Sequence, residues 1–120
     1  VLVVRRASDG GWELPGGRLG PDEDASAGVR REIAEETGID ARVGRPIHAV
    51  SWRNEGDSGR FAVYYWCEAL DDLDVRNDED PVTLSHEHVD YAWLSPESAT
   101  ERLSDVQERA VDVATEVYEP

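Results

Sequence analysis

The chain has 120 residues, of which 39% are hydrophobic, so it is long enough for one domain with a single core and too short for two. It carries 27 acidic residues against 12 arginines and no lysine, and its formal net charge at pH 7 is -15. Binding to nucleic acid or to an anionic membrane requires basic side chains that displace counterions, so this composition disfavours both partners.

Two absences bear on location. The sequence has no run of about 18 apolar residues that would span a membrane, and its first residues do not resemble a signal peptide. The single Cys67 has no partner for an internal disulfide and no CxxC neighbour for zinc. We therefore expect a soluble, cytoplasmic protein in which Cys67 is a packing residue.

Short β-branched and aromatic runs mark the expected strands. VLVVRR (1–6) is followed by the turn SDGG and a short strand at WEL (12–14). PIHAVSW (46–52) and RFAVYYWCEAL (60–70) flank the turn NEGDSG and predict a hairpin, with Phe61, Val63, Tyr65 and Cys67 on one face. A polar acidic loop is expected at 71–81, and YAWL (91–94) predicts a further strand.

Two helices complete the pattern. The first is expected over Asp24–Thr37, about 13 residues, with Gly38 as its C-terminal cap. The second begins at Ser104, which forms a capping box with Gln107, and its core stripe is Val106, Ala110, Val113 and Val117. Strands interleaved with one central and one terminal helix predict a layered α/β domain with a mixed sheet.

The first helix gathers three glutamates. At about 100° of rotation per residue, Glu32, Glu35 and Glu36 fall within roughly one quadrant of the helix. Val29 and Ile33 fall beside Glu36, which therefore borders the apolar side and should face a cleft. Clustered carboxylates are hard oxygen ligands, and Mg²⁺ is usually held by one or two of them together with waters and substrate phosphates. A polyphosphate is the natural substrate of such a site.

The stretch just before this helix contains consecutive glycines in LPGGR (14–18). Their backbone can approach a ligand closely, and a carbonyl there could add an oxygen ligand. The loop and the helix are therefore expected to converge on one site.

Residues 17–39 resemble the signature box of the Nudix hydrolase (MutT-like) family: Gly, five residues, Glu, seven residues, then Arg-Glu-apolar-any-Glu-Glu-any-Gly-apolar. WELPGG before the box and SHEHVDYAWLSPES (85–98) after it are also similar to the flanks seen in that family. The positions that match the box are Gly17, Glu23, Arg31, Glu32, Ile33, Glu35, Glu36, Gly38 and Ile39.

The resemblance implies a fold and an activity. The fold would be a Nudix-type α/β/α sandwich with a mixed β-sheet between helices, forming one domain over residues 1–120 and lacking a further strand that relatives carry before Val1. The activity would be that of a Mg²⁺-dependent (or Mn²⁺-dependent) pyrophosphohydrolase. It would cleave a nucleoside diphosphate linked to another moiety, such as a nucleoside triphosphate, an oxidised nucleotide or ADP-ribose, by attack of water at phosphorus.

The resemblance also implies residue roles. Arg31 would orient the carboxylates, and the general base would be Glu35 or Glu87, an alternative that stays open. Glu23 and Gly38 would be structural residues of the box, although Glu23 could also touch a metal. The metal ligands would be Gly17, through its carbonyl, Glu32, Glu35 and Glu36.

The remaining site candidates each have two interpretations. Arg5, Arg6 and Arg18 could bind substrate phosphates bidentately, or could pair with the abundant acids of the surface. Trp12 could stack on a nucleobase, as could Trp52, Tyr64 or Trp66, but aromatic residues of a small domain more often pack in its core.

The partner implied is a small nucleotide, with no nucleic acid and no membrane, and a homodimer is left open. The sequence alone does not decide the number of metals or the base preferred. Residues 54–57 carry neither the Pro typical of ADP-ribose hydrolases nor the Tyr typical of dinucleoside polyphosphate hydrolases. The alternatives to an enzyme are a nucleotide-binding or sensor module without turnover and a purely structural acidic domain.

The acid-rich, lysine-free composition predicts adaptation to high salt, as in a halophilic organism. At a charge of -15 the folded chain repels itself in dilute buffer, whereas about 1 M salt shortens the Debye length to about 3 Å and removes the repulsion. The melting temperature should therefore rise by several degrees from dilute buffer to molar KCl. A melting temperature that stays level or falls across the KCl series would contradict this adaptation.

Overall fold

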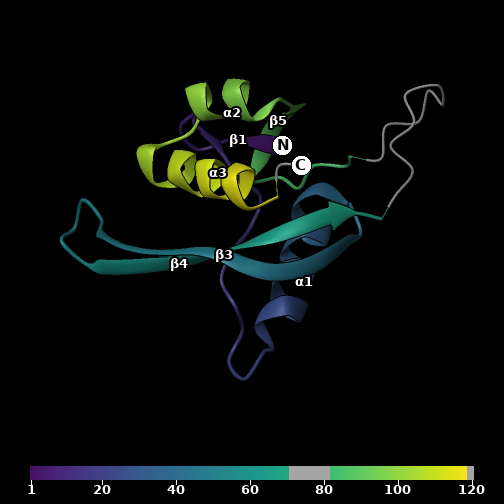
Figure 1. The fold of residues 1–120 in the computed structure, drawn as a ribbon, viewed down its shortest axis with the longest axis horizontal. Coiled ribbons are helices and arrows are strands. Elements are labelled where there is room, and N and C mark those ends of the chain that lie inside the picture. The colour runs from purple at the N-terminus through teal and green to yellow at the C-terminus, as the bar shows by residue number, and fades with distance from the viewer. Residues whose placement is uncertain (71–81, 119–120) are drawn as a thin grey trace.

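The computed structural model describes residues 1–70 and 82–118, so the acidic loop expected at 71–81 lies outside the described residues. Within the described part, no helix is long and apolar enough to cross a membrane. The elements in chain order (Figure 1) are β1 (Leu2–Arg6), β2 (Trp12–Glu13), α1 (Ala25–Thr37), β3 (Ala41–Arg53), β4 (Gly59–Ala69), β5 (His88–Trp93), α2 (Pro96–Arg102) and α3 (Asp105–Tyr118).

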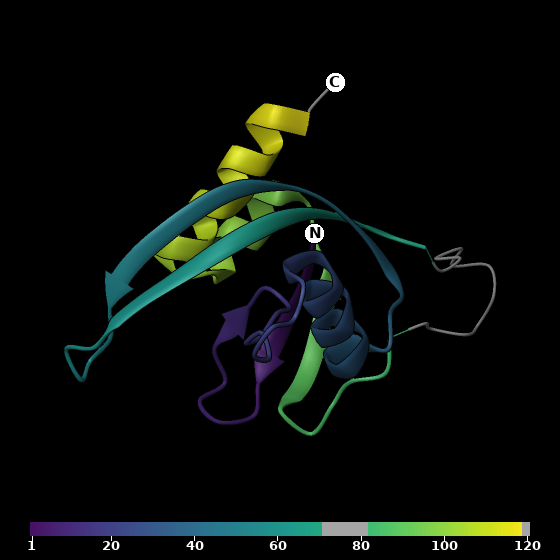
Figure 2. The ribbon, with the colours of Figure 1, turned by 90° about the horizontal axis from the view of Figure 1, so that it is seen from below.

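The described strands form two sheets that lie between helices. One sheet has the order β2-β1-β5, and the other is the β3–β4 hairpin. In Figure 2 the hairpin runs between α1 on one side and α3 on the other, so the expected α/β class is confirmed. The pairing differs in detail from a single mixed sheet. All pairs of described strands are antiparallel. The sheets are separate because β1 pairs with β2 and β5 along its two edges, while β3 and β4 pair only with each other.

Two apolar clusters hold these layers together. Val3 of β1 packs against Ala99, Leu103 and Val111 of the α2–α3 region. Its neighbour Leu2 packs against the other cluster, which includes Ile33 of α1 together with Ile39 and Ala41. Successive side chains of a strand point to opposite faces, so β1 is covered by α2 and α3 on one face and by α1 on the other.

Helix α1 begins and ends where the sequence predicts. The side chain of Asp24 accepts a hydrogen bond from the backbone N–H of Ala27, and Gly38 closes the helix with φ of 73° and an N–H that donates to the carbonyl of Ala34. Beyond it, the carbonyls of Glu36 and Thr37 accept hydrogen bonds from the N–H groups of Ser85 and Thr83. The chain before β5 is therefore fixed to the C-terminal end of α1.

Three features of the elements differ from, or go beyond, what the sequence predicts. Helix α2 was not expected as a separate helix; Ser95 caps it through the N–H of Ser98, and a Pro stands in its first turn. Val111, not Val117, completes the buried stripe of α3, because Val117 lies in the last turn and is exposed. Phe61 lies 80% exposed on the face that it shares with Cys67, because the hairpin extends past the helix that covers its base (Figure 1).

The buried position of Val3 generates a test of this core. Val3→Ala should lower the free energy of unfolding by about 2 kcal/mol, since it removes two buried methyl groups and leaves a small cavity. The matched control is Val89→Ala on β5, where the side chain is 63% exposed and the change should be close to zero. Urea denaturation, which adds no ions, measures both; equal losses would show that the Val3 cluster is not the core.

Candidate functional site

Glu36 is a buried carboxylate near the C-terminal end of α1. The residue is 7% exposed, and its Oε2 accepts a hydrogen bond of 3.0 Å from the N–H of Gly16. Its backbone carbonyl accepts a second bond of 3.0 Å from the N–H of Ser85. Among the described residues, no arginine or histidine lies within ion-pair distance of this carboxylate. Glu36 is therefore a buried acid without a bonded cation.

The surroundings of Glu36 change its protonation. Burial raises the pKa of its carboxyl to about 7, against an ordinary value of 4.5, because a low-dielectric environment penalises the charged form. The Gly16 N–H and the nearby His88 act in the opposite direction, and the charges of Glu13 and Glu32 add to the rise. A positive charge bound beside Glu36 would remove this penalty.

Arg31 gathers the other acids of the helix and of the loop before it. Its guanidinium bonds both oxygens of Glu23 at 2.7 and 3.0 Å, and Glu23 also accepts from the N–H of Gly20. The same guanidinium lies 2.9 Å from Glu32 and 3.0 Å from Glu35. The bond to Arg31, followed by that to Gly20, lowers the pKa of Glu23 to about 2. Arg31 and Glu23 thus join the loop to the helix.

Gly17 lies against Glu32 so closely that no side chain fits between them. A Cβ built at Gly17 would stand 2.2 Å from Oε2 of Glu32, well inside van der Waals contact. A larger residue at this position would displace either the loop or the carboxylate. Gly17 therefore lies with its backbone beside the carboxylate of Glu32.

The expected metal ligands are neighbours but do not converge on one point. Within the described residues, no group of three or more His, Cys, Asp or Glu side chains is arranged to hold a metal ion. The side chain of Glu35 is 59% exposed and bonds to Arg31, whereas Glu36 bonds to Gly16. The carboxylates do not converge because Glu32 and Glu35 form ion pairs with the guanidinium of Arg31.

The chemistry of these donors nevertheless fits a hard divalent cation. Glu32 and Glu36 carry carboxylate oxygens, and the backbone of Gly17 lies beside the carboxylate of Glu32. Glu36 is buried and has no bonded cation among the described residues, so it is the acid whose charged form a nearby cation would stabilise most.

Glu13 and His88 belong to this site although the box does not contain them. Oε1 of Glu13 lies 2.8 Å from Nε2 of His88, and Oε2 of Glu13 accepts from Nη1 of Arg6 at 3.0 Å. The residue pattern of the box singles out neither Glu13 nor His88. No local pattern could have found the pair, because it forms only when β2 and β5 flank β1.

A cavity of about 720 Å³ opens beside these residues. It is within the range of small-molecule sites, which occupy about 300–1,000 Å³. The box carboxylates Glu32, Glu35 and Glu36 are not among its lining residues. Its walls are largely apolar and aromatic and include Glu13, Gly17, Ile33, Tyr64, Trp66 and Gln107. Gln107 of α3 accepts from the N–H of Leu14 at 2.9 Å and also bonds the side chain of Tyr64.

The arginines expected to bind phosphates have different surroundings. Nε of Arg5 donates to the carbonyl of Gly10 at 3.0 Å, and Arg6 pairs with Asp9 at 2.8 Å as well as with Glu13. The side chain of Arg18 is exposed and has no hydrogen-bond or ion-pair partner among residues 1–70 and 82–118, while its carbonyl accepts from Arg31. Arg18 is therefore the best placed of the three to take a new anionic partner.

Trp12 packs in the core, whereas Glu87 is exposed in the turn before β5. Trp12 packs against the Val3 cluster, with the guanidinium carbon of Arg102 4.9 Å from the centre of its ring, so its faces serve packing. The carboxylate of Glu87 is exposed, and its backbone carbonyl accepts from the N–H of Ala7.

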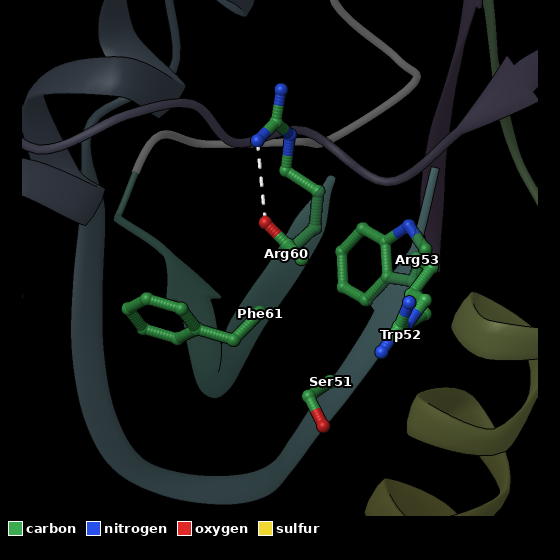
Figure 3. A pocket seen from close by; sticks show the side chains of 6 residues that line it. Ser51, Trp52, Arg53, Arg60 and Phe61 are labelled. Carbon is green, nitrogen blue, oxygen red and sulfur yellow. Dashed lines mark hydrogen bonds between the residues drawn. The ribbon is translucent and has the colours of Figure 1, made fainter. Parts of the chain in front are cut away.

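A second hollow, of about 430 Å³, lies at the far end of the hairpin (Figure 3). It is open and lined by Ser51, Trp52, Arg53, Gly59, Arg60 and Phe61. No carboxylate lines it, so the hollow lacks the ligands of a metal site. Trp52 also lines the larger cavity.

Comparison with known proteins finds similarity over nearly the whole chain. The NUDIX domain model matches residues 1–114. The chain is 34% identical over 106 residues to a MutT-like protein of Streptomyces ambofaciens, and the match covers 88% of this chain and 62% of that protein. It is 32% identical over 103 residues to the CTP pyrophosphohydrolase of Escherichia coli (strain K12), with 82% and 69% covered.

This chain is also similar to a solved structure over nearly its whole length. The MutT protein from Methanosarcina mazei Go1 aligns with a TM-score of 0.75 and 28% identity, covering 98% of this chain and 85% of that one. The chain spans less than two thirds of the length of the Streptomyces relative.

The buried state of Glu36 predicts a dependence of stability on pH. A carboxyl whose pKa is about 7 folded and 4.5 unfolded contributes stability that is fully present below pH 4.5 and is lost as the pH rises through 7. In EDTA at pH 8, Glu36→Gln should therefore be more stable than the wild type, by up to about 3 kcal/mol, and the difference should vanish at about pH 4. Urea denaturation at both pH values measures it, with the exposed Glu101→Gln as the control; a Glu36→Gln variant no more stable than the wild type at pH 8 would contradict the burial penalty.

Proposed function

The chain belongs to the NUDIX domain family, and from that premise we propose that it is a metal-dependent pyrophosphohydrolase of a small nucleotide. The substrate would be a nucleoside diphosphate linked to another moiety, and water would attack at phosphorus. The observation that carries the proposal is Glu36, a carboxylate withdrawn from water and held by the N–H of Gly16, with no bonded cation among residues 1–70 and 82–118. Buried carboxylates are usually paired, and in this chain even the half-buried Glu23 is paired with Arg31.

The residues that would hold Mg²⁺ or Mn²⁺ are Glu32, Glu36 and the carbonyl of Gly17, with Glu35 as the fourth. When bound, such an ion offsets the charge of phosphate oxygens and lowers the pKa of a bound water towards neutrality. Glu35 supports this role less directly, because its exposed carboxylate is bonded to Arg31 and would have to exchange that partner.

The protein's own residues would do the rest. Arg31 holds Glu32 and Glu35 in place by charge-assisted bonds and joins them to Glu23, which fixes the loop that carries Gly17. The proton of the attacking water would pass to Glu35 or to Glu87. Both carboxylates are exposed, which suits exchange of the proton with solvent, and we keep both as candidates for the general base.

A nucleoside triphosphate is the substrate that we would test first. The cavity of about 720 Å³ has room for a nucleoside beside Glu13 and Gly17, and its walls include Tyr64 and Trp66. The relative in Escherichia coli is named a CTP pyrophosphohydrolase. Arg18, exposed and next to Gly17 in the chain, would contact the phosphates; Arg6 would first have to leave Asp9 and Glu13.

The cellular setting is part of the proposal. A net charge of -15 without lysine supports a halophilic cytoplasm, where high salt screens self-repulsion. The same charge disfavours polyanionic macromolecules and leaves small nucleotides, whose charge is offset by a metal ion, as the partners.

The proposed activity predicts turnover of nucleotides that depends on a metal and on Glu36. In high salt with Mg²⁺, the protein should release nucleoside monophosphate from one or more members of a panel of nucleoside triphosphates, oxidised nucleotides, ADP-ribose and dinucleoside polyphosphates. EDTA should abolish release, and Glu36→Gln should reduce it by about 100-fold or more, since the variant loses a charged ligand. Glu101→Gln on α2, exposed to solvent and outside the box, should match the wild type.

Two results would overturn this proposal. Tight binding of nucleotides without release of product would favour the sensor module instead. Undiminished hydrolysis by Glu36→Gln would show that the metal assignment is wrong.

A further inference from the structure

The segment from Glu13 to Gly17 is held to three other parts of the fold. Its first residue bonds through its side chain to His88 at the start of β5, at 2.8 Å. The N–H of Leu14 donates to Gln107 of α3 at 2.9 Å, and the N–H of Gly16 donates to Glu36 of α1 at 3.0 Å. The segment carries the glycine backbone of the candidate metal site, so the precision of that site depends on these anchors.

His88 is the unusual anchor, because it is buried and only half bonded. Its side chain is 2% exposed, and Nε2 is bonded to Glu13. Nδ1 is buried and has no partner among the described residues. An unpaired buried polar atom costs about 1–3 kcal/mol, so an apolar residue of similar size would suit packing better. The feature that distinguishes the imidazole from an apolar side chain here is therefore the hydrogen bond from Nε2 to Glu13.

Because of where His88 lies, its bond to Glu13 connects the glycine segment to the C-terminal end of α1. The turn before it starts at Ser85, whose N–H holds the carbonyl of Glu36, and the N–H of His88 closes that turn on the carbonyl of Ser85. His88 thus stands on the same short unit that fixes the end of α1. By bonding Glu13, it ties the glycine segment to that unit.

We propose that His88 is a positioning residue of the candidate metal site: by donating to Glu13 it holds the Glu13–Gly17 segment so that Gly16 and Gly17 stay against Glu36 and Glu32. The inference rests on the proposed function. Glu13, Glu32 and Glu36 are three acids close enough to influence one another, as the pKa of Glu36 reflects. Without the donor, Glu13 would keep only Arg6 and would be repelled by the two box carboxylates.

A pair of substitutions separates the hydrogen bond from mere packing. His88→Met fills the same space without a donor, whereas His88→Gln places an amide N–H near the position of Nε2. Mn²⁺ affinity is measured by the electron paramagnetic resonance of free Mn²⁺, and kcat and KM are measured for the nucleotide that the wild type hydrolyses. Thermal melts show that each variant folds.

His88→Met should bind Mn²⁺ about 10-fold more weakly and lose about 10- to 100-fold in kcat, with the nucleotide KM within about 3-fold of the wild type. His88→Gln should recover most of both losses. A folded His88→Met variant with wild-type Mn²⁺ affinity and kcat, or a His88→Gln variant that fails as badly as His88→Met, would overturn the proposal.

Glu13→Ala tests the same link from the other side and replaces His88→Met if that variant does not fold. It should weaken Mn²⁺ binding to a similar extent. Where His88→Met folds, adding it to Glu13→Ala should cause little further loss, because the two residues act through one bond. Additive losses, or a Glu13→Ala variant with wild-type affinity, would overturn the proposal. If the wild type binds Mn²⁺ but hydrolyses no nucleotide, the proposed function is wrong. The Mn²⁺ affinities of the variants still test whether His88 positions the metal site.

Discussion

The burial of the Glu36 carboxylate is the constraint on which the rest of the site depends. Within the part of the chain that the structure describes, this acid is withdrawn from water without a bonded cation. Its charged form therefore destabilises the fold, which is why burial raises its pKa to about 7. The fold holds it there with two backbone N–H groups, that of Gly16 on the carboxylate and that of Ser85 on the carbonyl. Both donors come from loops, so the glycine segment and the turn before β5 meet at one residue of α1.

A division between neighbouring acids follows from the position of Arg31. One guanidinium serves Glu23, Glu32 and Glu35, and it sits on the side of α1 that faces the preceding loop. Glu36 instead accepts from the N–H of Gly16, which follows β2, and no arginine within 1–70 or 82–118 bonds it. The four glutamates of the box thus divide into Glu23, Glu32 and Glu35, which pair with Arg31, and Glu36, which has no such partner among the described residues.

The elements outside the signature stretch supply the walls and the anchors. The β3–β4 hairpin contributes Tyr64 and Trp66 to the cavity, and α3 contributes Gln107, which bonds both Tyr64 and the N–H of Leu14. The wall that would face a nucleoside and the loop that would face its phosphates are therefore linked through one amide. The chain shares its type of site with the NUDIX domain family. Members of one family can differ in substrate through contacts such as these, which lie outside the shared stretch.

Much of the fold and part of the site follow from local sequence. Asp24 and Gly38 bound α1 through caps whose chemistry is read from the residues themselves, and the helical rotation of about 100° per residue is enough to place Glu36 beside Ile33. The hairpin was predictable from its turn, but its length was not, because Arg42 to Gly44 become a strand only by pairing with residues near Cys67. The exposure of Phe61 could not be predicted either. The alternation of side chains along a strand tells which residues share a face of the hairpin, but not how much of that face α1 covers.

The amino-acid sequence alone specifies the box residues, their grouping on one helix and the acidic composition around them. Three further features depend on the tertiary structure: which of those acids Arg31 compensates, that Trp12 packs in the core, and that Glu13, His88 and Gln107 hold the glycine segment. The reason is one of range. Helical spacing and caps act over a few residues, whereas Glu13 and His88 are brought together by the two edges of β1, a pairing between segments 75 residues apart in the chain that no local pattern encodes.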